Sequence, residues 1–518
     1  MDNLQFVQRL FNGKNCYSDS MTEEQLSLLH IESGVEAIIR KMVSEGRIVF
    51  LTGNPGDGKT FIIKALREVL SDVYVETDLN SIADNELDMV MERIYDCYKN
   101  KRPCVIAANE FPFHKLMLLF KKNYPALYEE LKGLKKNILV FGYPTVELKR
   151  ICIVDLNERN LLDKDRCIVK KVLDCFTPLL EPYCGSNAIL AHNVNALKNV
   201  LVQQQLLHVF TLISLSGQHF VIRDILGALA YSLISCTDQD IDDAGYYYDA
   251  FFTGENELMR FARQFDPVLL TSPELDERLW NGEILDGWQL DCPSSWPANI
   301  TSGAGSVEDA LALFRSIKRK FYFENIYASA LNELQPRDLQ ECIRILQTIQ
   351  QDALRNKRML IFSMNKLFLS TDEERDKLRV WTSHSYDLSR TPGAAVSTRY
   401  IDSDDLELVY PAPVSWLSEM EYSPAYIVLR SKNHQEASLD IDIDMLRGLI
   451  MINNGYPAAL LSSQYEQVIS QFVRALCSVH IDRSYQDGTI MISDRREGTV
   501  KKIRIEADKY YLGSEVSY

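Results

Sequence analysis

The sequence predicts an α/β core near the amino terminus, followed by a large helical region and a carboxyl-terminal α+β domain. Short apolar segments alternate with helical periodicity up to residue 165, and apolar residues then recur at three- and four-residue spacing to about residue 360. Strand-like segments return after that point. Because 518 residues exceed what one hydrophobic core holds, we expect four segments: a helical segment over 1–45, the α/β core over 46–165, a helical lid and helical domain over 166–360, and the α+β domain over 361–518.

The composition is that of an ordinary globular chain, with 46% hydrophobic and 25% charged residues. The opening residues mix charged with apolar side chains, so they lack the uninterrupted apolar run of a secretory signal. No window approaches the roughly 20 uncharged apolar residues that a membrane-spanning helix needs. The 11 cysteines are scattered without a C-x-x-C pair, which disfavours a zinc site and fits a reducing compartment. We therefore expect a cytoplasmic protein that binds no membrane.

The formal net charge of −16 argues against a chain whose whole surface binds nucleic acid, because contacts to phosphates need clustered Lys and Arg. Local basic groups occur in the stretches FKKNYP, LKGLKKN, IKRK and DRREGTVKKIRIEADK. Each one is explained more simply as the solvated face of a helix or hairpin. We expect any contact with DNA to be made by a local basic patch or through a partner.

One stretch carries most of the functional information: RIVFLTGNPGDGKTFIIKAL, which reads as a buried strand, a glycine-rich loop and a helix. The loop fits the phosphate-binding pattern G-x-x-x-x-G-K-[ST] with Gly53, Asn54, Pro55, Gly56, Asp57, Gly58, Lys59 and Thr60. Glycines let the backbone turn its N–H groups towards phosphates. Lys59 would reach the β- and γ-phosphates, and the Thr60 hydroxyl would bind Mg²⁺. We expect a P-loop site for ATP and Mg²⁺; the alternative is a glycine-rich turn with an accidental Lys-Thr pair.

Hydrolysis at such a site needs a carboxylate at the tip of a neighbouring strand, where it holds Mg²⁺ or orients the attacking water. Glu110 follows the apolar stretch PCVIAAN at such a tip, and we assign it as the catalytic acid and a Mg²⁺ ligand. Asn109, however, stands where an aspartate is usual, and an amide cannot give a metal the charge of a carboxylate. Hydrolysis could then be slow or use Asp78 or Asp155, and Glu110 could simply cap a helix.

The order of these parts resembles that of AAA-like ATPases, which assigns two residues near the next apolar strand. In that class, a polar residue at the tip of the strand beside the acidic one senses the γ-phosphate, and Asn157 has the right order and rough spacing. Arg159 could stabilise phosphate charge in cis or across a subunit boundary. A surface arginine paired with Glu158 or Asp163 is the alternative.

Arg223 stands in the first turn of a helix predicted from SGQHFVIRDILGALAYSLI. It resembles the lid arginine that is called sensor 2 in AAA-like ATPases, and a plain structural pairing with Asp224 is the alternative. The nearby His208 and His219 lie among apolar residues. We interpret both histidines as packed or surface side chains rather than as bases.

The region after 361 shows both strand and helix patterns. The stretches RMLIFSMNKLFL, LELVYPAPVSW, AYIVLRS, GTIMISDR and VKKIRIEAD are typical of strands, whereas DIDMLRGLIMINNGY and SSQYEQVISQFVRALCSV are typical of helices. The acidic stretch EASLDIDIDM could suggest a metal site. Its alternating apolar and acidic residues more simply predict a strand that leads into a helix.

In the order of its parts, the chain resembles the DptF-type ATPases of phosphorothioation-dependent DNA restriction, which are bacterial anti-phage systems. The matching stretches are LTGNPGDGKT, VIAANE, IVDLNERNLL, FVIRDILGALAY, YYYDAFF, FDPVLL and DIDMLRGLIMINNGYP. The resemblance implies an ATPase subunit that works with nuclease or helicase partners, and AAA-like sites often lie between copies of one chain, which would make this chain a homo-oligomer. One hypothesis is an ATPase that couples hydrolysis to a DNA-directed complex. The other is a nucleotide-gated, STAND-like scaffold with slow or no hydrolysis.

Overall fold

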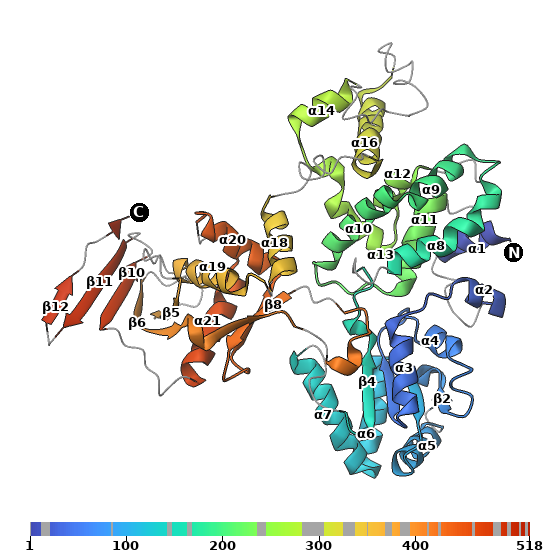
Figure 1. Ribbon diagram of the computed structural model, residues 1–518, viewed down its shortest axis with the longest axis horizontal. Coiled ribbons are helices and arrows are strands. Elements are labelled where there is room, and N and C mark those ends of the chain that lie inside the picture. Colours follow the sequence, from blue (N-terminus) through green and yellow to red (C-terminus); the bar gives the residue numbers. More distant parts are fainter. Residues whose placement is uncertain are drawn as a thin grey trace. The chain divides into compact units, whose positions relative to one another are not determined.

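The computed structural model divides the chain into two compact units (Figure 1). Unit 1 comprises Met1–Leu334 and Ala412–Ser423, and unit 2 comprises Gln335–Pro411 and Pro424–Tyr518. Residues 335–360, predicted with the helical domain, thus lie in unit 2, and 412–423, predicted with the α+β domain, lie in unit 1. The structure describes residues 2–11, 21–83, 86–141, 148–162, 168–235, 245–281, 305–324, 337–349, 351–367, 375–383, 394–411, 414–422, 426–457, 461–479, 488–494, 499–506, 509–512 and 516–517.

The centre of the first unit is a parallel sheet of four strands in the order β2-β3-β1-β4. The strands are β1 (Ile48–Thr52), β2 (Tyr74–Glu76), β3 (Cys104–Ala108) and β4 (Ile151–Asp155). Every residue of β1, β3 and β4 is buried, as expected for continuous apolar strands covered on both faces. The strands that the sequence predicts before the glycine-rich loop, before Glu110 and before Asn157 are confirmed.

Helices cover both faces of this sheet. Alternate residues of a strand point to opposite faces, so Val49 and Leu51 pack on one side and Ile48 and Phe50 on the other. The first side is covered by α3 (Gly34–Ser44) and α4 (Lys59–Ala65), and the second by α5 (Leu87–Lys99), α6 (Glu110–Asn123) and α7 (Pro125–Phe141).

The strand order corrects one expectation. Thr52 of β1 pairs with Ala108 of β3 on one side and with Asp155 of β4 on the other. The strand that precedes Asn157 is therefore not beside the strand that precedes Glu110, and the predicted neighbour relation is wrong. After β3, helices α6 and α7 carry the chain past β1 before it forms β4, so the two tips flank the loop that follows β1.

The other described residues of this unit are mostly helical, as the sequence predicts, and share one large core that includes the amino-terminal helix. Its helices are α1 (Asn3–Phe11), α2 (Glu23–Leu28), α8 (Ile168–Leu180), α9 (Ala188–Lys198), α10 (Val200–Ser214), α11 (Ile222–Ile234), α12 (Tyr247–Thr253), α13 (Glu257–Ala262), α14 (Pro273–Trp280) and α16 (Val307–Glu324). Across the described residues, no helix is both long and apolar enough to cross a membrane.

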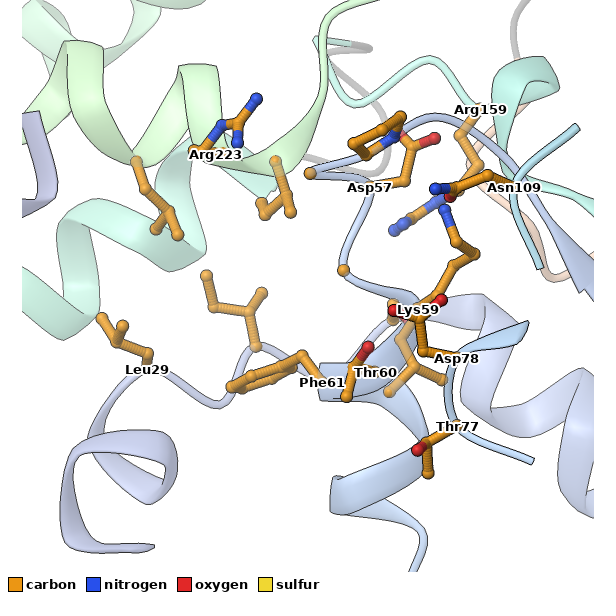
Figure 2. Close-up of a pocket in the computed structure, with 18 of the residues that line it drawn as sticks. Leu29, Asp57, Lys59, Thr60, Phe61, Thr77, Asp78, Asn109, Arg159 and Arg223 are labelled. Atoms are coloured by element: carbon orange, nitrogen blue, oxygen red, sulfur yellow. The ribbon is translucent and has the colours of Figure 1, made fainter. Parts of the chain in front are cut away.

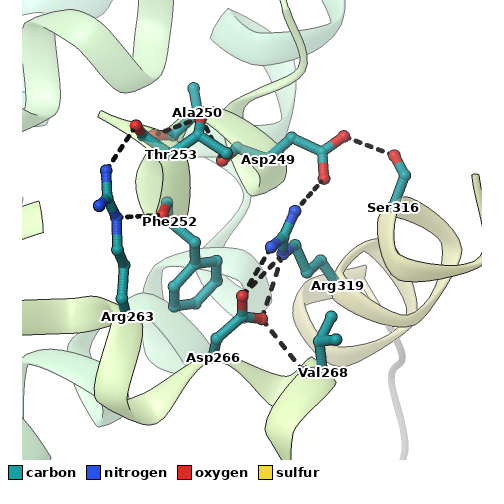
Figure 3. Close-up of polar contacts among 9 residues, drawn as sticks. All are labelled: Asp249, Ala250, Phe252, Thr253, Arg263, Asp266, Val268, Ser316 and Arg319. Atoms are coloured by element: carbon teal, nitrogen blue, oxygen red, sulfur yellow. Dashed lines mark hydrogen bonds and ion pairs between the residues drawn. The ribbon is translucent and has the colours of Figure 1, made fainter. Parts of the chain in front are cut away.

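A polar cluster fastens α16 to α12 inside this helical region (Figure 3). The guanidinium of Arg319 lies 2.6 Å from Asp266 and 2.9 Å from Asp249, and it stacks 5.6 Å from the ring of Phe252. Arg263 donates to the main-chain oxygen of Phe252 at 3.0 Å. Because each arginine is matched by carboxylates or by carbonyl groups, this cluster is structural.

The second unit combines helices with two antiparallel sheets, one in the order β12-β11-β10-β6-β5 with β13 beside β11, and one in the order β7-β8-β9. Its elements are α18 (Arg337–Thr348), α19 (Ala353–Lys366), β5 (Lys377–Ser383), β6 (Ala394–Asp402), β7 (Leu406–Val409), β8 (Tyr426–Ser431), β9 (Ser438–Asp442), α20 (Ile443–Asn453), α21 (Ser463–Val479), β10 (Thr489–Asp494), β11 (Thr499–Glu506), β12 (Lys509–Leu512) and β13 (Val516–Ser517).

The outcome of the predictions in this region is mixed. The stretch that begins at Arg358 forms the end of α19 and not a strand, because Leu360, Ile361 and Met364 recur at helical spacing and are all buried. The acidic stretch forms β9, with alternating exposed and buried residues, and runs directly into α20. The prediction of a strand that leads into a helix is confirmed there.

A short segment from the carboxyl-terminal half completes the core under the parallel sheet. We call residues 414–422 the strap. Its Leu417 and Met420 are buried against Val35 of α3 and Val49 of β1. In the chain, the strap stands between β7 and β8, so it joins two neighbouring strands of the second unit to the core of the first.

Candidate functional site

The loop between β1 and α4 has the backbone conformation that its glycines predict. Gly53, Gly56 and Gly58 have φ angles of 145°, 102° and 86°, and residues with a Cβ rarely adopt backbone conformations in this range. Two of these glycines also allow close packing from the helical region. A Cβ on Gly56 would lie 3.0 Å from Val221, and one on Gly58 would lie 3.3 Å from Ile222.

Lys59 closes this loop on itself. Its Nζ donates to the main-chain oxygen of Gly53 at 2.8 Å and to that of Asn54 at 2.7 Å. Burial lowers the pKa of Lys59, although Asp57 and more distant carboxylates oppose that shift. The amino group therefore lies inside the loop, where an anionic ligand would gain most from it.

The side chain of Asp57 lies beneath the loop and is almost fully buried. Its Oδ2 accepts from the main-chain N–H of Asn54 at 2.6 Å, and its Oδ1 lies 2.8 Å from Nε2 of His219. Because a carboxylate only accepts, the imidazole donates. Burial alone would lower the pKa of His219, but the hydrogen bond and charge of Asp57 raise it above the ordinary value. His219 is thus a packed side chain, as interpreted from the sequence, and its contact with Asp57 makes it part of the loop's support.

A cavity of about 240 Å³ opens beside the loop (Figure 2). Its polar wall combines Pro55–Thr60 of the loop with Asp78, Asn109, Arg159 and Arg223. Its apolar wall is formed by Met21, Leu29, Ile31, Phe61, Ile168, Ile222 and Leu226. Such a cavity suits a ligand with an anionic end and a flat apolar part.

Arg223 confirms its predicted position in the first turn of α11 and lines the cavity. Its main-chain N–H donates to the oxygen of Gly56 at 3.4 Å, and its side chain is near enough that a Cβ on Gly56 would lie 3.2 Å from Cζ. Asp224 accepts from the main-chain N–H of Val221 at 3.3 Å and so caps the helix. The helical region therefore brings a positive charge to the loop.

Arg159 also lines the cavity, but with a partner that the sequence did not indicate. Its Nε donates to Oε2 of Glu421 in the strap at 2.9 Å, and both side chains are buried. The predicted pairing with Glu158 is wrong, because the guanidinium turns towards the strap. Asp163, the other predicted partner, lies outside the described residues.

Glu110 and Asn157 lie outside the set of described residues that line the cavity. Glu110 is the first residue of α6 and is 46% exposed, and its carboxylate accepts from Nζ of Lys135 on α7 at 2.8 Å. Lys135 also lies 3.5 Å from Asp155. Asn157 follows β4, and its main-chain N–H donates to Asp155 at 3.2 Å. Of the predicted site residues, the structure therefore unites Pro55–Thr60, Arg159 and Arg223 in one cavity, and Gly53 and Asn54 do not line it.

Carboxylates that could help to hold a cation are sparse in the cavity. Asp78 follows β2 and lines the cavity, where its Oδ1 accepts from the main-chain N–H of Asn80 at 2.9 Å. Within the described ranges, no group of three or more His, Cys, Asp or Glu side chains is placed to bind a metal. Thr60 and Asp78 both line the cavity.

No family model, no curated protein and no solved structure matches this chain.

Proposed function

We propose that this chain binds ATP with Mg²⁺ at its glycine-rich loop and hydrolyses it. The supporting observation is one cavity in which Lys59, Thr60 and the loop glycines meet an apolar wall at the carboxyl edge of a parallel sheet, where ligands of α/β sheets bind. Lys59 would neutralise phosphate charge, and Thr60 would hold Mg²⁺. The metal supplies further neutralisation of the phosphates when bound.

Lys59→Ala tests this proposal. Nucleotide binding is measured by calorimetry with ATP and Mg²⁺ for the wild type and the variant, with thermal unfolding as the check on folding. Loss of the amino group should weaken binding of ATP by tenfold or more, since a hydrogen bond to a charged group contributes about 1.5–3 kcal/mol. Equal binding by the two folded proteins would exclude the loop as the phosphate site.

A nucleotide-gated scaffold is the second candidate function, and two observations favour it. An amide, Asn109, follows β3 where hydrolysis would need a carboxylate, and Glu110 is paired with Lys135. In this alternative, ATP binding organises an assembly and turnover is slow or absent. Single-turnover assays of the wild type and Glu110→Gln, with and without DNA, separate the two: a folded protein that binds ATP but never turns it over is a scaffold.

The resemblance to DptF-type ATPases suggests the cellular system in which this chain acts. We propose a cytoplasmic subunit of a bacterial anti-phage restriction system that works with nuclease or helicase partners, either as one copy or as a homo-oligomer. With a net charge of −16, the isolated chain should bind DNA weakly, through a local basic patch at most. Genes for a helicase or nuclease next to this one would support the proposal, and a steep loss of DNA affinity with salt would reveal direct contact with phosphates.

A further inference from the structure

Arg159 and Glu421 form a buried ion pair across 262 residues of sequence. Nε of Arg159 lies 2.9 Å from Oε2 of Glu421, and the two side chains are 5% and 4% exposed. A charge buried to this degree is costly unless it keeps its partner. The pair therefore holds the strap against the segment that follows β4.

Glu421 is held by two further bonds. Its Oε1 accepts from the main-chain N–H of Gly34 at 2.9 Å, and its main-chain oxygen accepts from the N–H of Asn160 at 2.7 Å. Burial would raise the pKa of Glu421, but the charge of Arg159 and the bond from Gly34 outweigh it and lower that pKa. The carboxylate is thus ionised and rigidly placed.

Arg159 faces two ways. Its Nε is engaged by the strap, while the same side chain lines the cavity beside the loop, on the side of Lys59 and Asn109 (Figure 2). Arginine presents a planar fork of donors, and the two terminal nitrogens suit the oxygens of a phosphate. A carboxylate on Nε fixes the plane of that fork and so lowers the entropy lost when a phosphate binds.

We propose that Glu421 is the positioning residue for Arg159, and that the pair lets the strap distinguish a bound triphosphate from a diphosphate. This inference rests on the proposed function. Arg159 would contact the terminal phosphate, and Glu421 would transmit that contact to residues 414–422. Because these residues lie between β7 and β8 in the chain, nucleotide state would reach the second unit through a covalent connection.

The test compares affinities for ADP and for adenylyl imidodiphosphate, a non-hydrolysable ATP analogue, both with Mg²⁺. Glu421→Gln and Arg159→Gln should each weaken binding of the analogue about tenfold while ADP affinity changes little. The double variant should lose no more than either single one, because both act on the same contact. Glu421→Asp should restore part of the preference for the triphosphate. Glu419→Gln, an exposed residue of the same strap, is the matched control.

Hydrogen exchange of the strap amides is the second readout. The analogue should slow exchange in residues 414–422 of the wild type more than ADP does, and Arg159→Gln should abolish that difference. If Glu421→Gln fails to fold, Arg159→Lys, which keeps the charge without the fork, should show the same loss of preference for the triphosphate.

Three outcomes overturn the inference and leave the proposed function intact. In two of them, Glu421→Gln and Arg159→Gln weaken binding of ADP and of the analogue equally, or change neither affinity. In the third, hydrogen exchange of the wild-type strap is the same with ADP and with the analogue. In each case nucleotide still binds. Absence of nucleotide binding by the wild type would instead remove the proposed function itself.

Discussion

His219 and Asp57 form a hydrogen-bonded pair that ties the helical region to the glycine-rich loop. Nε2 lies 2.8 Å from Oδ1, with the histidine 16% and the aspartate 2% exposed. The other oxygen of Asp57 holds the N–H of Asn54 at 2.6 Å. One carboxylate therefore joins the start of the loop to the segment that precedes α11.

This pair predicts a pH-dependent stability. A pKa that is raised in the folded state gives stabilisation that is complete below the unfolded value of 6.5 and is lost as the pH rises through the folded pKa. His219→Gln keeps a neutral donor but no charge. Wild type should be more stable than this variant by about 1–2 kcal/mol at pH 6, and the difference should shrink at pH 9.

Thermal unfolding at both pH values measures that difference. Glu158 also makes the free energy of unfolding fall as the pH rises, since burial raises its pKa to about 7. Only the comparison with His219→Gln therefore isolates the contribution of the histidine. His114→Gln, on the exposed side of α6, is the control. A difference that stays constant from pH 6 to pH 9 would contradict the ionised pair.

Gly56→Ala should distort the glycine-rich loop and so lower both the stability of the protein and its affinity for ATP. Its φ of 102° is unfavourable for alanine, and the new Cβ would lie 3.0 Å from Val221 and 3.2 Å from Arg223. We expect a loss of about 1–3 kcal/mol in stability and weaker binding of ATP. Gly133→Ala on α7 is the matched control, because a Cβ there meets nothing within 4 Å and should leave stability unchanged or improve it by up to about 1 kcal/mol.

Asn109→Asp should increase Mg²⁺-dependent turnover of ATP. Asn109 lines the cavity, and a carboxylate at this position would give the metal a charged ligand that the amide lacks. We expect at least a tenfold rise in kcat if hydrolysis is limited by the missing charge, measured as phosphate release over a range of Mg²⁺ concentrations. Unchanged turnover with tight ATP binding would favour the scaffold function.

Lys135→Met should also raise turnover, by freeing Glu110. Burial lowers the pKa of Lys135, but its bond to Glu110 and the charge of Asp155 raise it overall, so the ammonium neutralises the acid assigned to catalysis. The gain should disappear in Lys135→Met combined with Glu110→Gln. If Lys135→Met folds, binds ATP and hydrolyses it no faster than the wild type, the ion pair between Lys135 and Glu110 does not limit turnover.

The local parts of this site were predictable, and the long-range parts were not. β1, β3 and β4 followed from continuous apolar runs, and the conformation of the loop followed from its glycines. Arg223 was found because a helix start can be recognised from a few residues. Each of these predictions depends only on residues that are neighbours in the sequence.

The partners of Asp57 and Arg159 lie 162 and 262 residues away, and no periodicity encodes such a distance. The partner of His219 was not predicted, because the apolar residues next to it in the sequence do not indicate that a carboxylate from the loop contacts it. The stretch after Arg358 was misread for another reason: a short apolar run fits a buried helix as well as a strand.

The strap also affects how the protein is made. A ribosome releases the four strands of the parallel sheet long before Leu417 and Met420, yet these two side chains fill the core between α3 and β1. Until the strap is synthesised, the apolar side chains that Leu417 and Met420 bury lack part of their cover, and such late, long-range contacts favour slow folding. A shortened gene that stops at residue 334 would leave those side chains uncovered, and its product should aggregate more readily than the full chain.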